Sequence, residues 1–140
     1  MSANQPTPAY LHTHQRGTLV EHLGIETVLV EQGRILGQLD IKPHLLAPNG
    51  YLHAATVVAL ADSMCGYGCL AHLPEGAQGF TTIELKSNHL GTAREGLLEC
   101  EAKPAHLGRS TQVWDATVTA KGKLIALFRC TQMVLWPRQG

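Results

Sequence analysis

Asp62 is the only carboxylate between Leu52 and Ala71, a stretch otherwise built from small, apolar and uncharged polar side chains. An ionised carboxylate in an apolar core is costly unless it is paired or hydrogen-bonded. Asp62 must therefore have partners or a raised pKa, and a buried carboxylate with a raised pKa is a candidate catalytic group. The alternative is a structural carboxylate that holds two helices together at a dimer interface.

His53 and Ala54 stand near the beginning of the same stretch. The turn residues 48–50 precede them, so a helix that follows has its first free N–H groups near Leu52 to Ala55. Unpaired N–H groups and the positive end of the helix dipole suit such a position to holding an oxyanion. The dipole also favours a neutral imidazole, so we expect His53 to position a carbonyl group; a hydrogen bond to local backbone is the alternative.

The spacing of His53 and Asp62 separates the two side chains. Nine residues at about 100° each amount to about two and a half turns, so they point to opposite faces roughly 13 Å apart along the axis. They cannot serve one site within one chain. The simplest solution is a two-fold homodimer in which the helix start of one subunit faces the middle of the partner's helix.

The elements that must position these residues follow from the apolar pattern. Residues 25–31 and 34–41 predict a hairpin, and the apolar stretch, which has no polar stripe, predicts a helix buried on every face and ending near His72. Strands are predicted over Phe80–Asn88, Gly96–His106, Ser110–Ala120 and Leu124–Trp136. This order indicates an α+β fold, a curled antiparallel sheet wrapped around one long buried helix, since only a sheet on most sides could bury it.

The composition indicates one domain. The 140 residues, 44% hydrophobic, suffice for one core over residues 17–140, after a flexible N-terminal arm at residues 1–16. Eleven acidic and eleven basic residues balance, which gives no reason to expect nucleic acid or an anionic membrane as a partner. No cluster of ligands with metal spacing is present, so no metal is expected.

The cysteines and the start of the chain favour a cytoplasmic protein. The four cysteines have no CxxC spacing, and the chain opens without a charged-then-apolar signal segment, so we expect reduced thiols. The apolar stretch is long enough to raise the question of a membrane span. Asp62, Gly66 and Gly68 within it argue against one.

Several strings resemble the hotdog-fold acyl-CoA thioesterases. They are Gly50-Tyr51-Leu52-His53-Ala54-Ala55, Asp62 nine residues after the histidine, Ser87-Asn88-His89, and Ala105-His106-Leu107-Gly108-Arg109-Ser110. The resemblance covers about residues 20 to 136, and it is greatest to the Arthrobacter-type 4-hydroxybenzoyl-CoA thioesterases and the phenylacetate-pathway thioesterases. It implies a homodimer that pairs into a homotetramer and hydrolyses an acyl-CoA or aryl-CoA thioester, without a cofactor other than the CoA of the substrate.

The resemblance also implies roles for individual residues. Asp62 is the nucleophile or general base, and the Ala54 backbone N–H of the opposite subunit binds the thioester carbonyl, with His53 beside it. Substrate contacts are expected from residues of the turn, the helix, a strand end and the next strand's start: Asn49, Gly50, Gly66, Asn88, His89, Arg109 and Ser110. Of these, His89 would line the acyl or pantetheine channel, and Arg109 and Ser110 would contact the CoA phosphates.

Three positions depart from the family pattern. Ala54-Ala55 replace Gly-Gly, Ala47 replaces a Gln that contacts the thioester, and Gly66 replaces a Ser or Thr one turn after the carboxylate. The backbone N–H survives a change from Gly to Ala, so the oxyanion role is chemically intact. The departures leave two alternatives open: a hotdog enoyl-CoA hydratase or dehydratase, and a non-catalytic acyl-CoA-binding protein.

Overall fold

The computed structural model describes residues 5–138. The chain begins with two short helices and a strand pair, continues through one long helix, and ends with four strands. The elements in chain order are α1 (Pro8–His14), α2 (Leu19–His22), β1 (Glu26–Glu31), β2 (Arg34–Ile41), the 3-10 helix η1 (Pro43–Leu45), α3 (Ala54–Ala71), β3 (Gly79–His89), β4 (Gly96–Leu107), β5 (Thr111–Ala120) and β6 (Lys123–Leu135).

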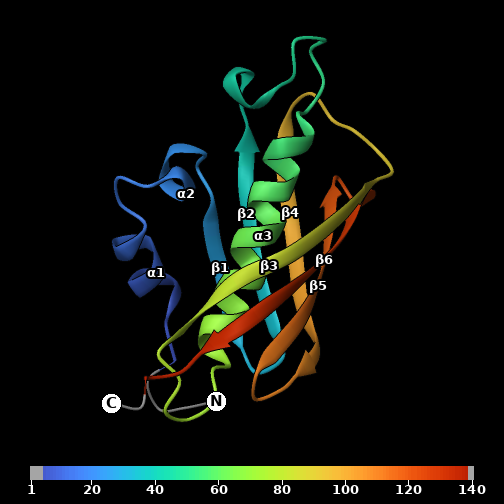
Figure 1. Cartoon of the computed structure of the whole chain (residues 1–140). Helices are drawn as coiled ribbons and strands as arrows, with labels where there is room; N and C mark the ends of the chain where they lie inside the picture. The colour runs from blue at the N-terminus through green and yellow to red at the C-terminus, as the bar shows by residue number, and fades with distance from the viewer. Residues whose placement is uncertain (1–4, 139–140) are drawn as a thin grey trace.

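All six strands form one antiparallel sheet in the order β1-β2-β4-β5-β6-β3. β1 and β2 are the predicted hairpin, and β4, β5 and β6 are consecutive neighbours joined by short turns. β3 pairs with β6 at the far edge, where Phe80 lies opposite Val134 and His89 opposite Ala126. The sheet curls around α3 (Figure 1), which confirms the predicted α+β architecture.

Glycines allow α3 to pack closely on this sheet. A Cβ at Gly68 of the helix would lie 2.5 Å from the ring of Trp114 on β5, and a Cβ at Gly37 of β2 would overlap the thioether of Met64. Side chains do not approach this closely, so these two contacts require a residue without a Cβ. Gly68, one of the two glycines that interrupt the apolar stretch, is therefore a packing position of a core helix.

One strip of α3 is left uncovered by the sheet. Ala55, Ala59, Asp62, Ser63 and Leu70 are half-buried or exposed, and their helical spacing places them on one side. The expectation that the helix is buried on every face is thus wrong for a single chain, because one sheet covers only the other side. The helix is long and apolar enough to cross a membrane, yet 56% of it is buried inside the fold.

The N-terminal segment packs on the domain. Thr7 caps α1 by accepting a hydrogen bond from the Tyr10 N–H at 3.2 Å, and Leu11 is 2% exposed. The buried Gln15 donates to the carbonyl oxygen of Ile25 at 2.8 Å and accepts from the hydroxyl of Tyr67 at 3.1 Å. From residue 5 onward, the segment that the sequence predicts to be a flexible arm thus contacts the domain, and these contacts were not visible in the local sequence. Residues 1–4 lie outside the described part.

Candidate active site

His53 defines the beginning of α3. Its backbone is extended, and its Nδ1 accepts a hydrogen bond from the Ala55 N–H at 2.8 Å, so it is the N-cap residue and the helix begins at Ala54. Because Nδ1 is an acceptor here, the neutral ring carries its proton on Nε2. The alternative expected for His53, a hydrogen bond to local backbone, is therefore observed. This cap uses Nδ1 and does not involve Nε2.

The Ala54 N–H is a free donor at the helix start. The Thr56 N–H donates to the His53 carbonyl oxygen at 3.0 Å, and the Ala55 N–H is taken by the His53 ring. Within residues 5–138 the Ala54 N–H has no acceptor. It lies at the positive end of an eighteen-residue helix, where a negative charge is stabilised.

The loop before the helix is held in one conformation. Gly50 has a φ of +85°, as a tight turn requires, and the Asn49 side-chain oxygen accepts from the Tyr51 N–H at 3.1 Å. The Ala47 N–H donates to the Tyr51 carbonyl oxygen at 2.7 Å, and the Leu52 N–H donates to that of Ala93 at 2.9 Å. This last bond ties the loop to the segment between β3 and β4.

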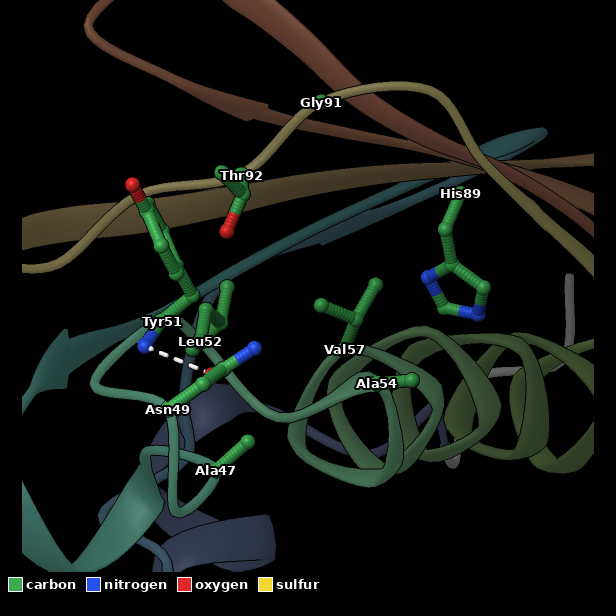
Figure 2. A pocket seen from close by; sticks show the side chains of 9 residues that line it. All are labelled: Ala47, Asn49, Tyr51, Leu52, Ala54, Val57, His89, Gly91 and Thr92. Atoms are coloured by element: carbon green, nitrogen blue, oxygen red, sulfur yellow. Dashed lines mark hydrogen bonds between the residues drawn. The ribbon is translucent and has the colours of Figure 1, made fainter.

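A cavity of about 360 Å³ lies between the loop, the first turn of α3 and the β3–β4 segment (Figure 2). Most of its wall is apolar, with a few polar groups, the pattern typical of a small-molecule site. It is lined by Ala47, Asn49, Tyr51, Leu52, Ala54, Val57, His89, Gly91 and Thr92. The free N–H of Ala54 therefore belongs to a residue of the cavity wall.

Asp62 lies outside this cavity. Its side chain is half-buried, and Oδ1 is inaccessible and has no hydrogen-bond partner. Burial raises the pKa of the Asp62 carboxyl above its usual value of 3.8. Eight residues of helix separate Ala54 from Asp62, about 12 Å along the axis. One chain thus holds a donor and an acid that do not meet, as the spacing predicted.

The structure separates two further pairs of candidates. His89 lines the cavity, whereas Asn88 points to the outer face of the sheet and lines a different depression with Lys86 and Arg129. The separation follows from the alternation of side chains along β3. A Cβ at Gly66 would lie 3.3 Å from Phe80, so a larger residue there requires that ring to move.

Arg109 and Ser110 lie at the other end of α3. They connect β4 to β5 beside the end of β6, whereas α3 begins near the start of β4 (Figure 1). The Arg109 guanidinium stacks on the Trp136 ring, 4.4 Å from its centroid, and the Trp136 indole N–H donates to the Arg109 carbonyl oxygen at 3.1 Å. Within one chain these residues are remote from Ala54.

Sequence reasoning did not find the β3–β4 wall of the cavity. Gly91 and Thr92 line it, and Arg94 stacks on Tyr51 at its edge, 4.1 Å from the ring centroid. Residues this far from the helix start in sequence reach it only through the sheet order and the Leu52–Ala93 bond. No local pattern of residues could have indicated this contact.

The comparisons with known proteins agree with this geometry. Residues 49–126 match the model of the family described as "Thioesterase superfamily". The chain belongs to the thioesterase superfamily. The hotdog resemblance drawn from the sequence is confirmed. This enzyme is a thioesterase, and the reaction it catalyses is thioester hydrolysis.

Three relatives of this thioesterase illustrate the similarity. The 1,4-dihydroxy-2-naphthoyl-CoA hydrolase of Listeria monocytogenes is 36% identical over 81% of this chain and 92% of its own. The proofreading thioesterase EntH of Klebsiella pneumoniae is 30% identical over 92% and 94%. The solved structure of a variant of thioesterase PA1618 from Pseudomonas aeruginosa has a TM-score of 0.90 at 26% identity, covering 95% and 96%.

Proposed function

We propose that this thioesterase hydrolyses an acyl-CoA or aryl-CoA thioester to the free acid and CoA, at a site shared by two subunits. The observation that carries the proposal is that one chain holds two unused groups: the Ala54 N–H at the cavity and the buried, unpartnered Asp62 oxygen. Within one chain the donor has no catalytic acid near it, and the acid has no oxyanion donor near it. A second subunit would supply the missing group to each. Relatives named as CoA hydrolases support the choice of CoA thioesters.

Two surfaces support a homodimer. β3 is an edge strand, and its large apolar residues Ile83 and Leu85 are 53% and 43% exposed. An exposed, apolar edge strand is a template for pairing with another strand. Pairing two β3 strands antiparallel would extend the sheet and bring the uncovered strips of two α3 helices toward each other, with the start of each near the partner's Asp62. Association of two such dimers into a tetramer remains our expectation from the resemblance.

In the proposed reaction the thioester carbonyl oxygen accepts a hydrogen bond from the Ala54 N–H. Negative charge grows on this oxygen as the carbonyl carbon becomes tetrahedral, and the helix start stabilises that charge. The carbon–sulfur bond then breaks, the thiolate of CoA leaves, and a proton restores the thiol. His53 supplies a neutral ring beside the carbonyl.

Asp62 of the partner subunit can act in two ways. As a general base, it takes a proton from a water that attacks the carbonyl carbon. As a nucleophile, its oxygen attacks that carbon to form a mixed anhydride, which water then hydrolyses. Acid quenching during turnover separates these routes, because only the second leaves an acyl group on the Asp62 peptide in mass spectrometry.

The CoA moiety would lie along the surface of the dimer. Arg109 and Ser110 remain our candidates for its phosphates, and their position at the far end of α3 means that they would act from the subunit that supplies Asp62. His89 would line the acyl or pantetheine channel from the subunit that supplies Ala54. Asn88, on the outer face, is the least favourably placed of the predicted contacts.

The test is release of free thiol from a panel of acyl-CoA and aryl-CoA thioesters. We expect turnover by the wild type and its loss in Asp62→Ala and Asp62→Asn. Hydration of an enoyl-CoA without thiol release would instead indicate a hydratase. Tight binding of the thioesters without turnover would indicate a binding protein, and either result would refute the proposal.

A further inference from the structure

The carboxamide of Asn49 has a chemically determined orientation. One of its two terminal atoms lies 3.1 Å from the Tyr51 backbone nitrogen, which carries a hydrogen and can only donate. The atom that faces Tyr51 must therefore be the oxygen. Its nitrogen, with two N–H donors, must then point the other way.

That nitrogen points into the cavity. Figure 2 shows it on the side of the first turn of α3, where Ala54 and Val57 lie, while the oxygen faces Tyr51. Among residues 5–138 this nitrogen has no hydrogen-bond acceptor. The hydrogen bonds of the loop, including those between Ala47 and Tyr51 and between Leu52 and Ala93, keep the carboxamide in place before any ligand arrives.

Two unused donors therefore line one small cavity, the Asn49 carboxamide and the Ala54 N–H. We propose that the Asn49 nitrogen is a second hydrogen-bond donor to the thioester carbonyl oxygen, beside the Ala54 N–H. This inference rests on the proposed hydrolysis and deepens it. The Asn49 amide forms no covalent bond and transfers no proton; it stabilises the charge on the oxygen while the carbonyl carbon is tetrahedral.

A preorganised donor of this kind acts mainly in the transition state. The carbonyl oxygen carries more charge there than in the bound substrate, so removing the donor should lower kcat more than it changes KM. Loss of one oxyanion donor lowers kcat by about 10²- to 10³-fold in well-studied enzymes. We expect a loss of this size for Asn49.

Two substitutions separate the donor from the turn that it stabilises. Asn49→Asp keeps an oxygen for the Tyr51 N–H and a residue type that favours this turn, but it replaces the donor with a carboxylate oxygen. Asn49→Ala removes both. We expect both variants to lose kcat by about 10²-fold or more. The control is Gln78→Glu, the same change from amide to carboxylate at an exposed position between α3 and β3.

The contrary outcome is equally clear. If Asn49 only shapes the turn, Asn49→Asp will keep the kcat of the wild type while Asn49→Ala loses it, and the inference is overturned. In that case wild-type hydrolysis and its loss in Asp62→Asn still stand, so the proposed function survives.

A binding measurement tests the same donor without turnover. A ketone analogue, with a methylene between sulfur and carbonyl, keeps the carbonyl oxygen, whereas the matching S-alkyl-CoA thioether lacks it. The wild type should bind the ketone more tightly, and Asn49→Asp should lose this preference. Equal preference in both proteins would refute the inference. If the wild type binds neither analogue and releases no thiol from the thioester panel, the proposed function is refuted with it.

Discussion

Asp62 combines a chemical role with a cost to stability. Its carboxyl is half-buried and lacks a partner for Oδ1, and burial raises its pKa. A side chain held in this state is poorly solvated when ionised, which makes it a better proton acceptor than an exposed aspartate. The same poor solvation disfavours the folded state at neutral pH, and such trade-offs are common at active sites.

Asp62→Asn should therefore raise the free energy of unfolding at pH 7 while abolishing turnover. Since the folded pKa lies above the unfolded value, near 3.8, the stability contributed by Asp62 is present below about pH 4 and lost as the pH rises through the folded pKa. The gain of the Asn variant should accordingly vanish near pH 3. Urea unfolding at matched protein concentration, at several pH values, measures this difference.

The control for this prediction is Asp40→Asn on the exposed side of β2. It should change the unfolding free energy by no more than about 0.5 kcal/mol. If Asp62→Asn instead unfolds the protein at neutral pH, the carboxylate is structural before it is catalytic.

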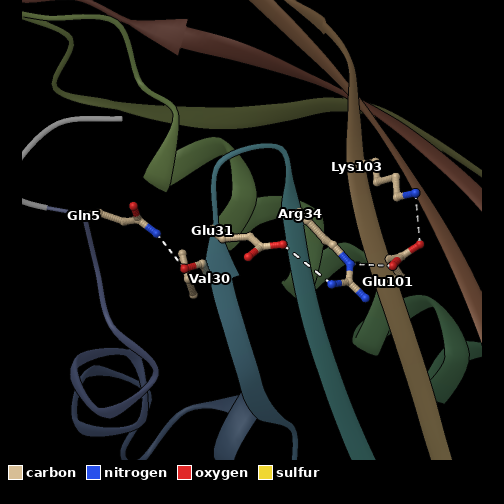
Figure 3. A network of polar contacts seen from close by, with 6 residues as sticks. All are labelled: Gln5, Val30, Glu31, Arg34, Glu101 and Lys103. Carbon is tan, nitrogen blue, oxygen red and sulfur yellow. Dashed lines mark hydrogen bonds and ion pairs between the residues drawn. The ribbon is translucent and has the colours of Figure 1, made fainter.

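At the scale of elements, the N-terminal segment covers one edge of the sheet. Gln5 donates to the Val30 carbonyl oxygen at 2.7 Å, and the Thr27 N–H donates to the His12 ring at 3.2 Å (Figure 3 shows the first). These are backbone groups of β1, the edge opposite β3.

The outer face of the sheet next to this edge is charged. Arg34 pairs with both Glu31 and Glu101, and the second carboxylate oxygen of Glu101 pairs with Lys103 (Figure 3). Covered edges and charged faces discourage pairing with other sheets.

Removing the cover should open this edge. The double variant Gln5→Ala with His12→Ala leaves two backbone groups of β1 without partners, so we expect assemblies larger than those of the wild type to accumulate with concentration. Light scattering coupled to size-exclusion chromatography measures the mass. Arg16→Ala, at an exposed position of the same segment, is the control. An unchanged mass at all concentrations would show that the segment does not protect the edge.

At the scale of the molecule, the proposed site needs two copies of the chain. Mixing two inactive variants, Asp62→Ala and Ala54→Trp, should restore activity because each heterodimer contains one site with both an intact helix start and an intact carboxylate. Random exchange predicts about a quarter of wild-type activity per chain, since half the dimers are mixed and half their sites are intact.

The measurement is thiol release after subunit exchange, with native mass spectrometry to count the mixed dimers. Mixing each variant with itself is the control. Mixed dimers without recovered activity would contradict a site shared between subunits.

Local sequence was enough to predict the helix with its lone acid, the six strands and the half-turn between His53 and Asp62, because periodicity and turn residues act over short distances. It placed the helix start only within Leu52 to Ala55, and the structure fixes it at Ala54, where the His53 ring caps the helix by accepting from the Ala55 N–H. Only the tertiary structure brought Gly91 and Thr92 to the cavity and docked α1, because these outcomes depend on strand order and on contacts distant in sequence.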